Sequence, residues 1–158
     1  MGVARVHVRA WQVAYHGLMH ADYLAALRPE ERARRYNFAS ADPTQPQTVV
    51  AVEADAILGF ATTAPARDAD AAGQGELCAL YVEPGLWGRG VGRALASAAG
   101  SNLYGLGFRQ AMLWVVAGNA RAQQFYRADG WTPDGQRRAQ QIWNVTVDTV
   151  RYSRALIS

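Results

Sequence analysis

The sequence predicts a mixed α/β domain with a strand–loop–helix–strand–helix unit at its centre. Apolar runs typical of buried strands alternate along the chain with segments whose apolar residues recur at helical spacing. The chain has 158 residues, of which 50% are hydrophobic and 18% charged, a composition typical of one globular domain. No long linker, internal repeat or change of composition divides it, so residues 1–158 are expected to form a single domain.

The first half of the chain is expected to begin with a strand, continue with helices and end in a hairpin. Residues 3–9 alternate apolar and polar positions, which predicts a half-buried strand. Residues 10–27 have helical spacing, and Asp22 is a candidate cap for a second helix within them. Residues 48–65 predict two strands around a tight turn at 53–56.

The second half of the chain contains the central unit. Its expected elements are a strand at 76–82, a helix from 90 to about 104, a strand at 108–116, a helix between 119 and 130, and two or three strands from 131 to about 156. The strand at 76–82 is apolar almost throughout, so both of its faces are expected to be covered. Asn119 is a favourable N-cap for the second helix, and Gly130 is placed to end it.

The composition excludes several classes of function. The single cysteine, Cys78, rules out an internal disulfide and a cysteine-based zinc cluster, and its place in a strand predicts an inert core residue. All 16 basic residues are arginine, so a Walker loop or a Schiff-base lysine is impossible. The arginines are scattered, which argues against a nucleic-acid-binding surface. Without a signal peptide or a membrane-spanning apolar run, the protein is expected to be cytoplasmic and not bound to a membrane.

Three glycines, Gly88, Gly90 and Gly92, stand at alternate positions between a predicted strand and a predicted helix. A helix N-terminus presents unpaired N–H groups and a partial positive charge, and glycines leave that backbone open to a ligand. Arg89 and Arg93 add guanidinium donors suited to phosphate. The pattern predicts a pyrophosphate-binding cradle, although tight packing of the strand on the helix is a second interpretation. The spacing does not fit a dinucleotide fingerprint.

Two motifs together resemble the GNAT superfamily of N-acetyltransferases. Residues 87–92, Trp-Gly-Arg-Gly-Val-Gly, resemble its acetyl-CoA signature Gln/Arg-x-x-Gly-x-Gly/Ala, with a departure at Trp87. Residues 119–131, NARAQQFYRADGW, resemble the pattern Asn-x-x-Ala-x-x-Phe-Tyr-x-x-x-Gly-Phe, with Trp131 as the final aromatic. Residues 10–27 are similar to the opening helices of many small bacterial members, so the resemblance covers nearly the whole chain.

The resemblance implies a fold, a cosubstrate and a set of site residues. The fold is a mixed, mostly antiparallel central sheet of about six to seven strands, with splayed central strands and about four flanking helices. The cosubstrate is acetyl-CoA, without a metal, and the acetyl group passes directly to a primary amine in a ternary complex. Tyr126 is the implied general acid, which protonates the leaving thiolate. The implied acetyl-CoA-binding residues are Leu80, Tyr81, Val82, Gly88, Arg89, Gly90, Val91, Gly92, Arg93 and Asn119.

The general base is less well defined by the sequence. Glu76 begins the central strand, and alternation places it on one face with Cys78 and Leu80. In many members of the family an acidic residue on this strand activates the amine, whereas an exposed strand-end glutamate is the other interpretation. His16 and His20 are candidates for lining the acceptor pocket, but they lack the third ligand that a zinc site needs.

The acceptor and the assembly stay open at this level. A small-molecule amine and a peptide N-terminus both fit, and Asp22, Glu30 and Glu31 suit either recognition of a cationic amine or helix capping. A non-catalytic acyl-CoA-binding sensor or interaction module of the same fold is an alternative function, and a nucleotide-binding protein is another. The final strand around Tyr152 is similar to one that forms dimer interfaces in relatives, so a homodimer is compatible with the resemblance.

Overall fold

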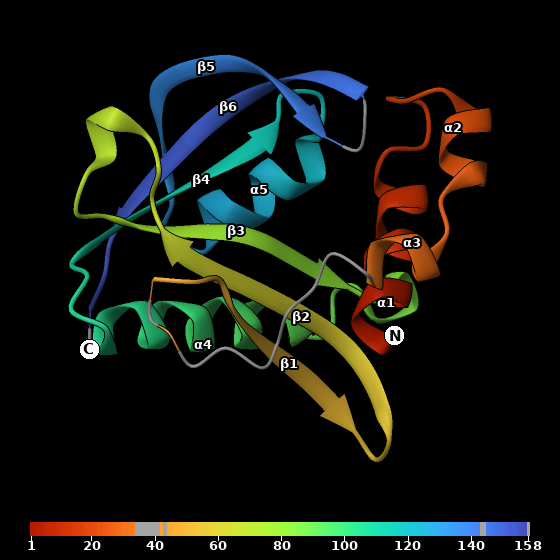
Figure 1. Ribbon diagram of the computed structural model, residues 1–158, viewed down its shortest axis with the longest axis horizontal. Helices are drawn as coiled ribbons and strands as arrows, with labels where there is room; N and C mark the ends of the chain where they lie inside the picture. Colours follow the sequence, from red (N-terminus) through yellow and green to blue (C-terminus); the bar gives the residue numbers. More distant parts are fainter. Residues whose placement is uncertain (34–41, 43, 143–144, 158) are drawn as a thin grey trace.

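The computed structural model describes residues 1–33, 42, 44–142 and 145–157. Within these ranges a six-stranded sheet carries helices on both faces (Figure 1). The strands are β1 (Gln47–Glu53), β2 (Ala56–Pro65), β3 (Gly75–Val82), β4 (Gln110–Val116), β5 (Thr132–Ile142) and β6 (Val145–Ala155). The helices are α1 (Gly2–Ala14), α2 (Ala21–Ala26), α3 (Pro29–Ala33), α4 (Val91–Gly105) and α5 (Ala120–Ala128), with 3-10 turns η1 (Ala69–Ala71) and η2 (Pro84–Leu86). None of the described helices is long and apolar enough to span a membrane.

The strands follow the order β1-β2-β3-β4-β6-β5, and every neighbouring pair is antiparallel except β3 and β4. In the described residues these two parallel strands pair only at Gly75 with Ala111 and Glu76 with Met112, after which they diverge (Figure 1). The mixed, mostly antiparallel sheet with splayed central strands is therefore confirmed. The predicted hairpin is confirmed as well, since β1 ends at Glu53 and β2 begins at Ala56.

An irregularity in β3 changes the direction of its side chains. Thr62 of β2 pairs with Ala79, whereas the next residue, Thr63, pairs with Leu77. Cys78 lies between these two pairs without a partner on β2, which is the arrangement of a β-bulge. An extra residue of this kind reverses the inside–outside alternation along a strand.

The bulge corrects two expectations for β3. Leu77 and Leu80 both pack on the main core, so Glu76 and Leu80 do not share a face as simple alternation predicted. Cys78 is exposed and is not a core residue, so the expectation that both faces of the strand are covered is wrong at this position. Tyr81 packs toward α1, on the other side of the sheet from Leu80.

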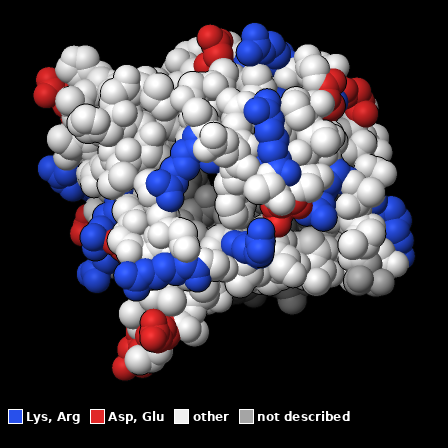
Figure 2. Space-filling model, turned by 180° about the vertical axis from the view of Figure 1, so that it is seen from behind, with Lys and Arg blue, Asp and Glu red and all other residues white. Residues whose placement is uncertain are grey.

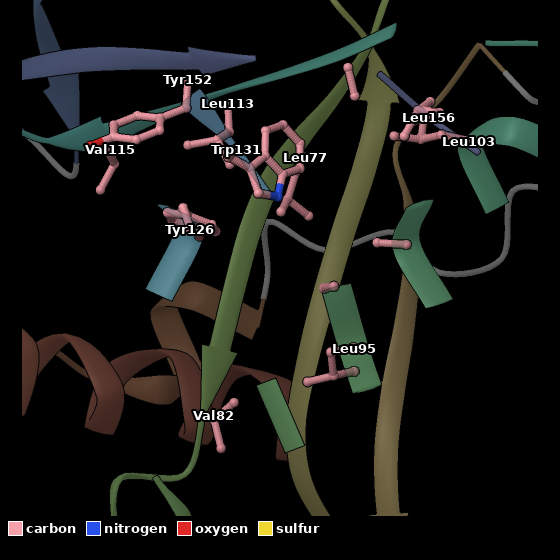
Figure 3. Packing of buried hydrophobic residues seen from close by; sticks show 13 residues of the cluster. Leu77, Val82, Leu95, Leu103, Leu113, Val115, Tyr126, Trp131, Tyr152 and Leu156 are labelled. Carbon is pink, nitrogen blue, oxygen red and sulfur yellow. The ribbon is translucent and has the colours of Figure 1, made fainter. Parts of the chain in front are cut away.

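The main core lies between the sheet and helices α4 and α5 (Figure 3). From α4 it receives Leu95, Ala99 and Leu103, at the helical spacing of four residues that brings side chains to one face. Leu103 lies so close to Gly75 that a Cβ atom on this glycine would be 2.7 Å from its Cδ2 atom. The close approach of helix and strand thus depends on a residue without a side chain.

Residues 3–9, expected as a strand, belong to helix α1, so that prediction is wrong. Val3 and Val6 pack against Phe60 of β2, while Arg5 and Arg9, four residues apart, are exposed. Buried and exposed positions follow the helical period along α1, although a short stretch of it also fits the strand period. The tertiary contact with β2 and β3 selects the helix.

The expected cap of the second helix is corrected, and the place of the final strand in the sheet is defined. His20, and not Asp22, is the N-cap of α2, because its Nδ1 atom accepts a hydrogen bond of 3.2 Å from the Asp22 backbone N–H. Strand β6 lies between β4 and β5, so it is not a sheet edge that could pair with a second chain. Tyr152 of β6 is fully buried, and its hydroxyl donates to Gln123 Oε1 at 2.7 Å, so this residue does not present a dimer surface.

Leu103→Ala is expected to lower the free energy of unfolding by about 3 kcal/mol, as buried leucine deletions typically do. Leu103 is 2% exposed, and Gly75 has no side chain that could move into the cavity. Leu106→Ala at the end of the same helix is the control, since Leu106 is 40% exposed and its loss should cost less than about 0.5 kcal/mol. Urea denaturation followed by circular dichroism measures both, and equal destabilisation by the two variants would contradict this packing.

Candidate active site

A cleft of about 960 Å³ runs past the point where β3 and β4 diverge. Its lining comes from α1, β3, the turn before α4, β4, α5 and β5, so it joins the two faces of the sheet. Seen from the side opposite to that of Figure 1, the surface is hollowed near its centre, and basic side chains, all arginine in this chain, surround the hollow (Figure 2). The short pairing of β3 with β4 is the reason that this space exists.

The glycine turn forms one end of the cleft, and its glycines have two different roles. Gly88 and Gly90 have φ angles of 81° and 86°, a region that favours glycine, and a Cβ atom on either would meet no atom of the described residues within 4 Å. Their backbone is therefore open toward the cleft, which both residues line. Gly92 lines the cleft too, but a Cβ atom there would be 3.2 Å from Phe125 of α5. The packing interpretation thus holds for Gly92, whereas Gly88 and Gly90 have the open backbone that the cradle interpretation requires.

Trp87 occupies the position at which the sequence departs from the acetyl-CoA signature. Its Nε1–H donates to the carbonyl oxygen of Val82 at 2.9 Å, which ties the turn to the end of β3. The guanidinium of Arg121, on the first turn of α5, lies 3.9 Å above the centre of the Trp87 ring. Trp87 and Arg121 both line the cleft, so the tryptophan holds a cation beside the glycine turn.

Tyrosine hydroxyls and a tryptophan form a buried polar network at the middle of the cleft. Trp11 Nε1–H donates to the Tyr81 hydroxyl at 2.8 Å. Burial raises the pKa of Tyr15, although hydrogen bonds with Asn119 and Tyr81 oppose the shift. Burial also raises the pKa of Tyr81 well above its ordinary value. These phenols therefore stay protonated at neutral pH and can donate hydrogen bonds.

Tyr126 lines the same part of the cleft from α5. Burial raises the pKa of its phenol, and the neighbouring Tyr15 and Asp129 raise it further. The side chain is 9% exposed and packs edge-on against Phe125 and Trp131. Tyr126 is thus a protonated donor held in a fixed orientation by aromatic neighbours.

Asn119 combines a structural contact with a place in the cleft. Its Oδ1 atom accepts a hydrogen bond of 3.1 Å from the Ala122 backbone N–H, which confirms the predicted N-cap of α5. Because this oxygen is occupied, the amide NH2 group of Asn119 remains as the donor. The side chain of Asn119 also forms a hydrogen bond with Tyr15.

Glu76 and Cys78 lie beside one another on β3, at the bulge. The Cys78 thiol is 3.6 Å from Glu76 Oε2, and both residues line the cleft. Burial raises the pKa of Glu76, whereas its hydrogen bond with Cys78 lowers this pKa. Of the nearby charges, Asp68 raises the pKa, and Arg138 and Arg67 lower it. Cys78 is exposed toward the cleft, yet desolvation of its sulfur by the surrounding protein and the Glu76 charge raise the pKa of the thiol, so it is protonated and a poor nucleophile.

Most of the residues expected at the site do meet in this cleft. Those lining it are Glu76, Leu80, Tyr81, Val82, Gly88, Gly90, Gly92, Arg93, Asn119 and Tyr126. Arg89 is exposed outside the lining and Val91 packs on the main core. Asp22, Glu30, His16 and His20 are exposed and lie outside the lining as well, while the side chain of Glu31 lies outside the described residues. The described part of the chain contains no cluster of side chains that could hold a metal ion.

Sequence reasoning missed the residues that complete the cleft from other elements. From α1 come His7 and Trp11, and its C-cap residue is Tyr15; the three are four residues apart and so lie on one side of the helix. That spacing was the available signal, and the strand interpretation of residues 3–9 concealed it. Arg67 and Arg138 carried no local signal, because they belong to a loop and to an exposed strand.

The comparisons with known proteins agree with this geometry. The model of the acetyltransferase (GNAT) family matches residues 9–131, more than half of the chain. A curated relative, the uncharacterized N-acetyltransferase YuaI of Bacillus subtilis (strain 168), is 32% identical over 93 residues, which is 59% of this chain and 52% of that protein. The chain therefore spans about half the length of that relative.

Solved structures of low sequence identity share the fold. A GCN5-related N-acetyltransferase from Rhodopseudomonas palustris has a TM-score of 0.72 at 19% identity, over 98% of this chain and 88% of that one. One from Kribbella flavida has a TM-score of 0.70 at 23% identity, over 98% and 90%. The PaiA N-acetyltransferase from Thermoplasma acidophilum, solved in complex with coenzyme A, has a TM-score of 0.65 at 16% identity, over 96% and 89%. With the match to the family model, these findings show that the chain belongs to the acetyltransferase (GNAT) family.

Proposed function

We propose that this protein transfers the acetyl group of acetyl-CoA to a primary amine while both substrates are bound. The observation that carries the proposal is one continuous cleft, which runs from the glycine turn before α4, past the diverging strands, to the Glu76 carboxylate. Membership of the acetyltransferase family supports the reaction class. The coenzyme A bound to Thermoplasma acidophilum PaiA supports acetyl-CoA as the donor.

The donor end of the cleft has the groups that a pyrophosphate needs. The open backbone at Gly88 and Gly90 leads into the N-terminus of α4, whose N–H groups and dipole favour an anion. Arg93 and Arg121 line the cleft there and supply guanidinium donors. In this proposal Arg121, held on the Trp87 ring, provides the polar contact that the first position of the signature provides in other members.

The pantetheine arm would lie along β3. Among the described residues β4 pairs with β3 only as far as Glu76, so the edge of β3 from Leu80 to Val82 offers backbone groups to the cleft. Amide groups of an extended ligand can pair with such an edge as an added strand would. The Asn119 amide lies across the cleft as a further donor.

The reaction needs a neutral amine, a polarised thioester carbonyl and a proton for the departing sulfur. The amine nitrogen forms a bond to the acetyl carbon, and the carbon–sulfur bond breaks. The proton lost by the amine goes to Glu76, directly or through water, and from there to solvent. The thiolate takes the hydroxyl proton of Tyr126, which solvent later restores. The products are an N-acetyl amine and coenzyme A with a free thiol.

Binding of the donor is tested first by calorimetric titration with acetyl-CoA, with ATP and NAD as controls for a nucleotide-binding function. We expect acetyl-CoA to bind and the controls to be silent. Arg121→Gln should weaken acetyl-CoA binding about tenfold, because a charge-assisted hydrogen bond contributes about 1.5–3 kcal/mol. Arg127→Gln on the same helix is the matched control, since Arg127 is exposed outside the cleft lining. Absence of acetyl-CoA binding to the unaltered protein would refute the proposed function.

Tyr126→Phe is expected to lower kcat about 10²-fold through loss of the proton donor, while the dissociation constant of acetyl-CoA stays unchanged. Release of the coenzyme A thiol in the presence of an amine measures kcat, and calorimetry measures binding. Tyr104→Phe serves as the control, because Tyr104 of α4 does not line the cleft. A protein that binds acetyl-CoA but releases no thiol with any amine would support the non-catalytic sensor instead.

The pH dependence tests Glu76 as the base. Burial raises its pKa above 4.5, so the carboxylate that accepts the proton forms only as the pH rises through this higher value. We expect kcat/KM to increase with pH across that range. Glu76→Gln should lose this rise of kcat/KM with pH and should lower kcat about 10²-fold. Glu53→Gln is the control, because Glu53 is exposed. If kcat/KM of Glu76→Gln still rose with pH as in the unaltered protein, another group would be the base.

A further inference from the structure

Around Glu76 the cleft has a compartment whose side chains are not among those of the proposed donor site. Arg67 follows β2, Trp114 stands on β4, and Arg138 and Gln140 stand on β5, and all of these residues line it. This compartment lies next to the proposed base, because the charges of Arg67 and Arg138 act on Glu76. It is therefore the place where the body of an acceptor would lie.

The carboxylates of this region are already bound within the protein. Arg151, which is 8% exposed, donates to both oxygens of Asp70 at 2.7 Å and to Asp134 at 2.6 Å. It also donates to Asp68 Oδ2 at 3.1 Å, which accepts from Trp114 Nε1–H at 3.0 Å as well. These carboxylates are thus committed to Arg151 and its neighbours and are poor partners for an incoming ammonium group.

The guanidinium groups, in contrast, have donors to spare. Arg138 lies flat on the Trp114 ring, 4.0 Å from its centre, and donates to Asp68 Oδ1 at 3.2 Å. Its Nη2 atom also lies 3.5 Å from Gln140 Oε1, but the side chain is still 41% exposed, so it keeps N–H donors for a ligand. In the described part of the chain Arg67 forms no ion pair, and its side chain is exposed.

The charges and the hydrogen-bonding groups of this compartment both favour an acceptor that carries an amine and an anionic group. Asp68, Asp70 and Asp134 are paired with Arg138 and Arg151, whereas Glu76 and Arg67, which line the cleft, form no ion pair among the described residues. Glu76 is thus left to attract the ammonium form of an amine. The donors left over on Arg67 and Arg138 match an anionic group, since a planar guanidinium pairs with a carboxylate through two parallel hydrogen bonds. A polycationic acceptor would instead place a further ammonium group against these guanidiniums.

We propose that the acceptor is an amine that also carries a carboxylate, with its amino group at Glu76 and its carboxylate at Arg138 and Arg67. This inference rests on the proposed function. The chemistry is unchanged: the amine nitrogen bonds to the acetyl carbon as the carbon–sulfur bond breaks, one proton leaves the amine, and the thiolate gains one. Arg138 and Arg67 act as specificity residues that bind the carboxylate and take no part in proton transfer.

The test uses matched acceptors with the unaltered full chain. Each set contains an amino acid or a dipeptide, its C-terminal carboxamide, and the amine that lacks the carboxyl group; spermidine represents the polycations. Thiol release and mass spectrometry of the products report acetylation. We expect kcat/KM to be at least about tenfold higher for the carboxylate than for its carboxamide, the loss of one charge-assisted contact. Equal rates, preference for the carboxamides or spermidine, or no acetylation of any carboxylate would overturn the inference.

Variants test the residues. Arg138→Gln and Arg67→Gln should each raise KM for the carboxylate acceptor about tenfold, leave KM for its carboxamide unchanged, and keep acetyl-CoA affinity. Arg137→Gln is the control, because Arg137 is the exposed neighbour of Arg138 on β5 and does not line the cleft. Arg67→Gln breaks no ion pair in the described residues, so it keeps the test valid if Arg138→Gln disturbs the Asp68 cluster. Unchanged selectivity in both variants would contradict the assignment.

The two proposals fail in different ways. A protein that binds acetyl-CoA and acetylates carboxamides or polyamines better than carboxylates keeps the acetyltransferase function and loses only the acceptor class. A protein that does not bind acetyl-CoA loses both.

Discussion

The structure depends on how briefly β3 and β4 pair. Among the described residues two pairs join these parallel strands, and beyond Glu76 the strands separate. The backbone edge of β3 therefore faces open space within a sheet that is otherwise continuous. Buried backbone groups need hydrogen-bond partners, and an edge inside the fold is therefore a natural place for an extended, amide-containing ligand. The glycine turn, α5 and α1 are all arranged around this gap.

Polar clusters, as well as apolar packing, hold the walls of the cleft. Arg151 binds Asp68, Asp70 and Asp134 and so joins the loop after β2 to strands β5 and β6. Arg151 is buried but Asp70 is about half exposed, so these ion pairs add little net stability, although they fix the positions of their members. Asp68 of this cluster accepts hydrogen bonds from Trp114 and Arg138 and so orients both side chains. On the other side Trp11 and Tyr81 fix α1 against β3 in the same manner.

Trp87, at the departure from the signature, is in contact with a cation from another helix. A tryptophan cannot supply the donor groups of glutamine or arginine to a phosphate. Here its ring supports the Arg121 guanidinium from another helix, and its N–H secures the turn on β3. A cation thus stands beside the turn even though the signature position itself is aromatic.

The sequence by itself determined the features that depend on neighbouring residues. The Asn119 cap, the open turn at Gly88 and Gly90, the hairpin after Glu53 and the order of the central unit follow from local backbone preferences and from short-range periodicity. Only the tertiary structure decided that residues 3–9 are helical, because two periods fit so short a segment and contact with β2 selects one. It also decided the bulge at Cys78, which arises from pairing with β2. The contact of Arg138 with Asp68 joins residues 70 positions apart, and only the folded sheet brings such residues into one compartment.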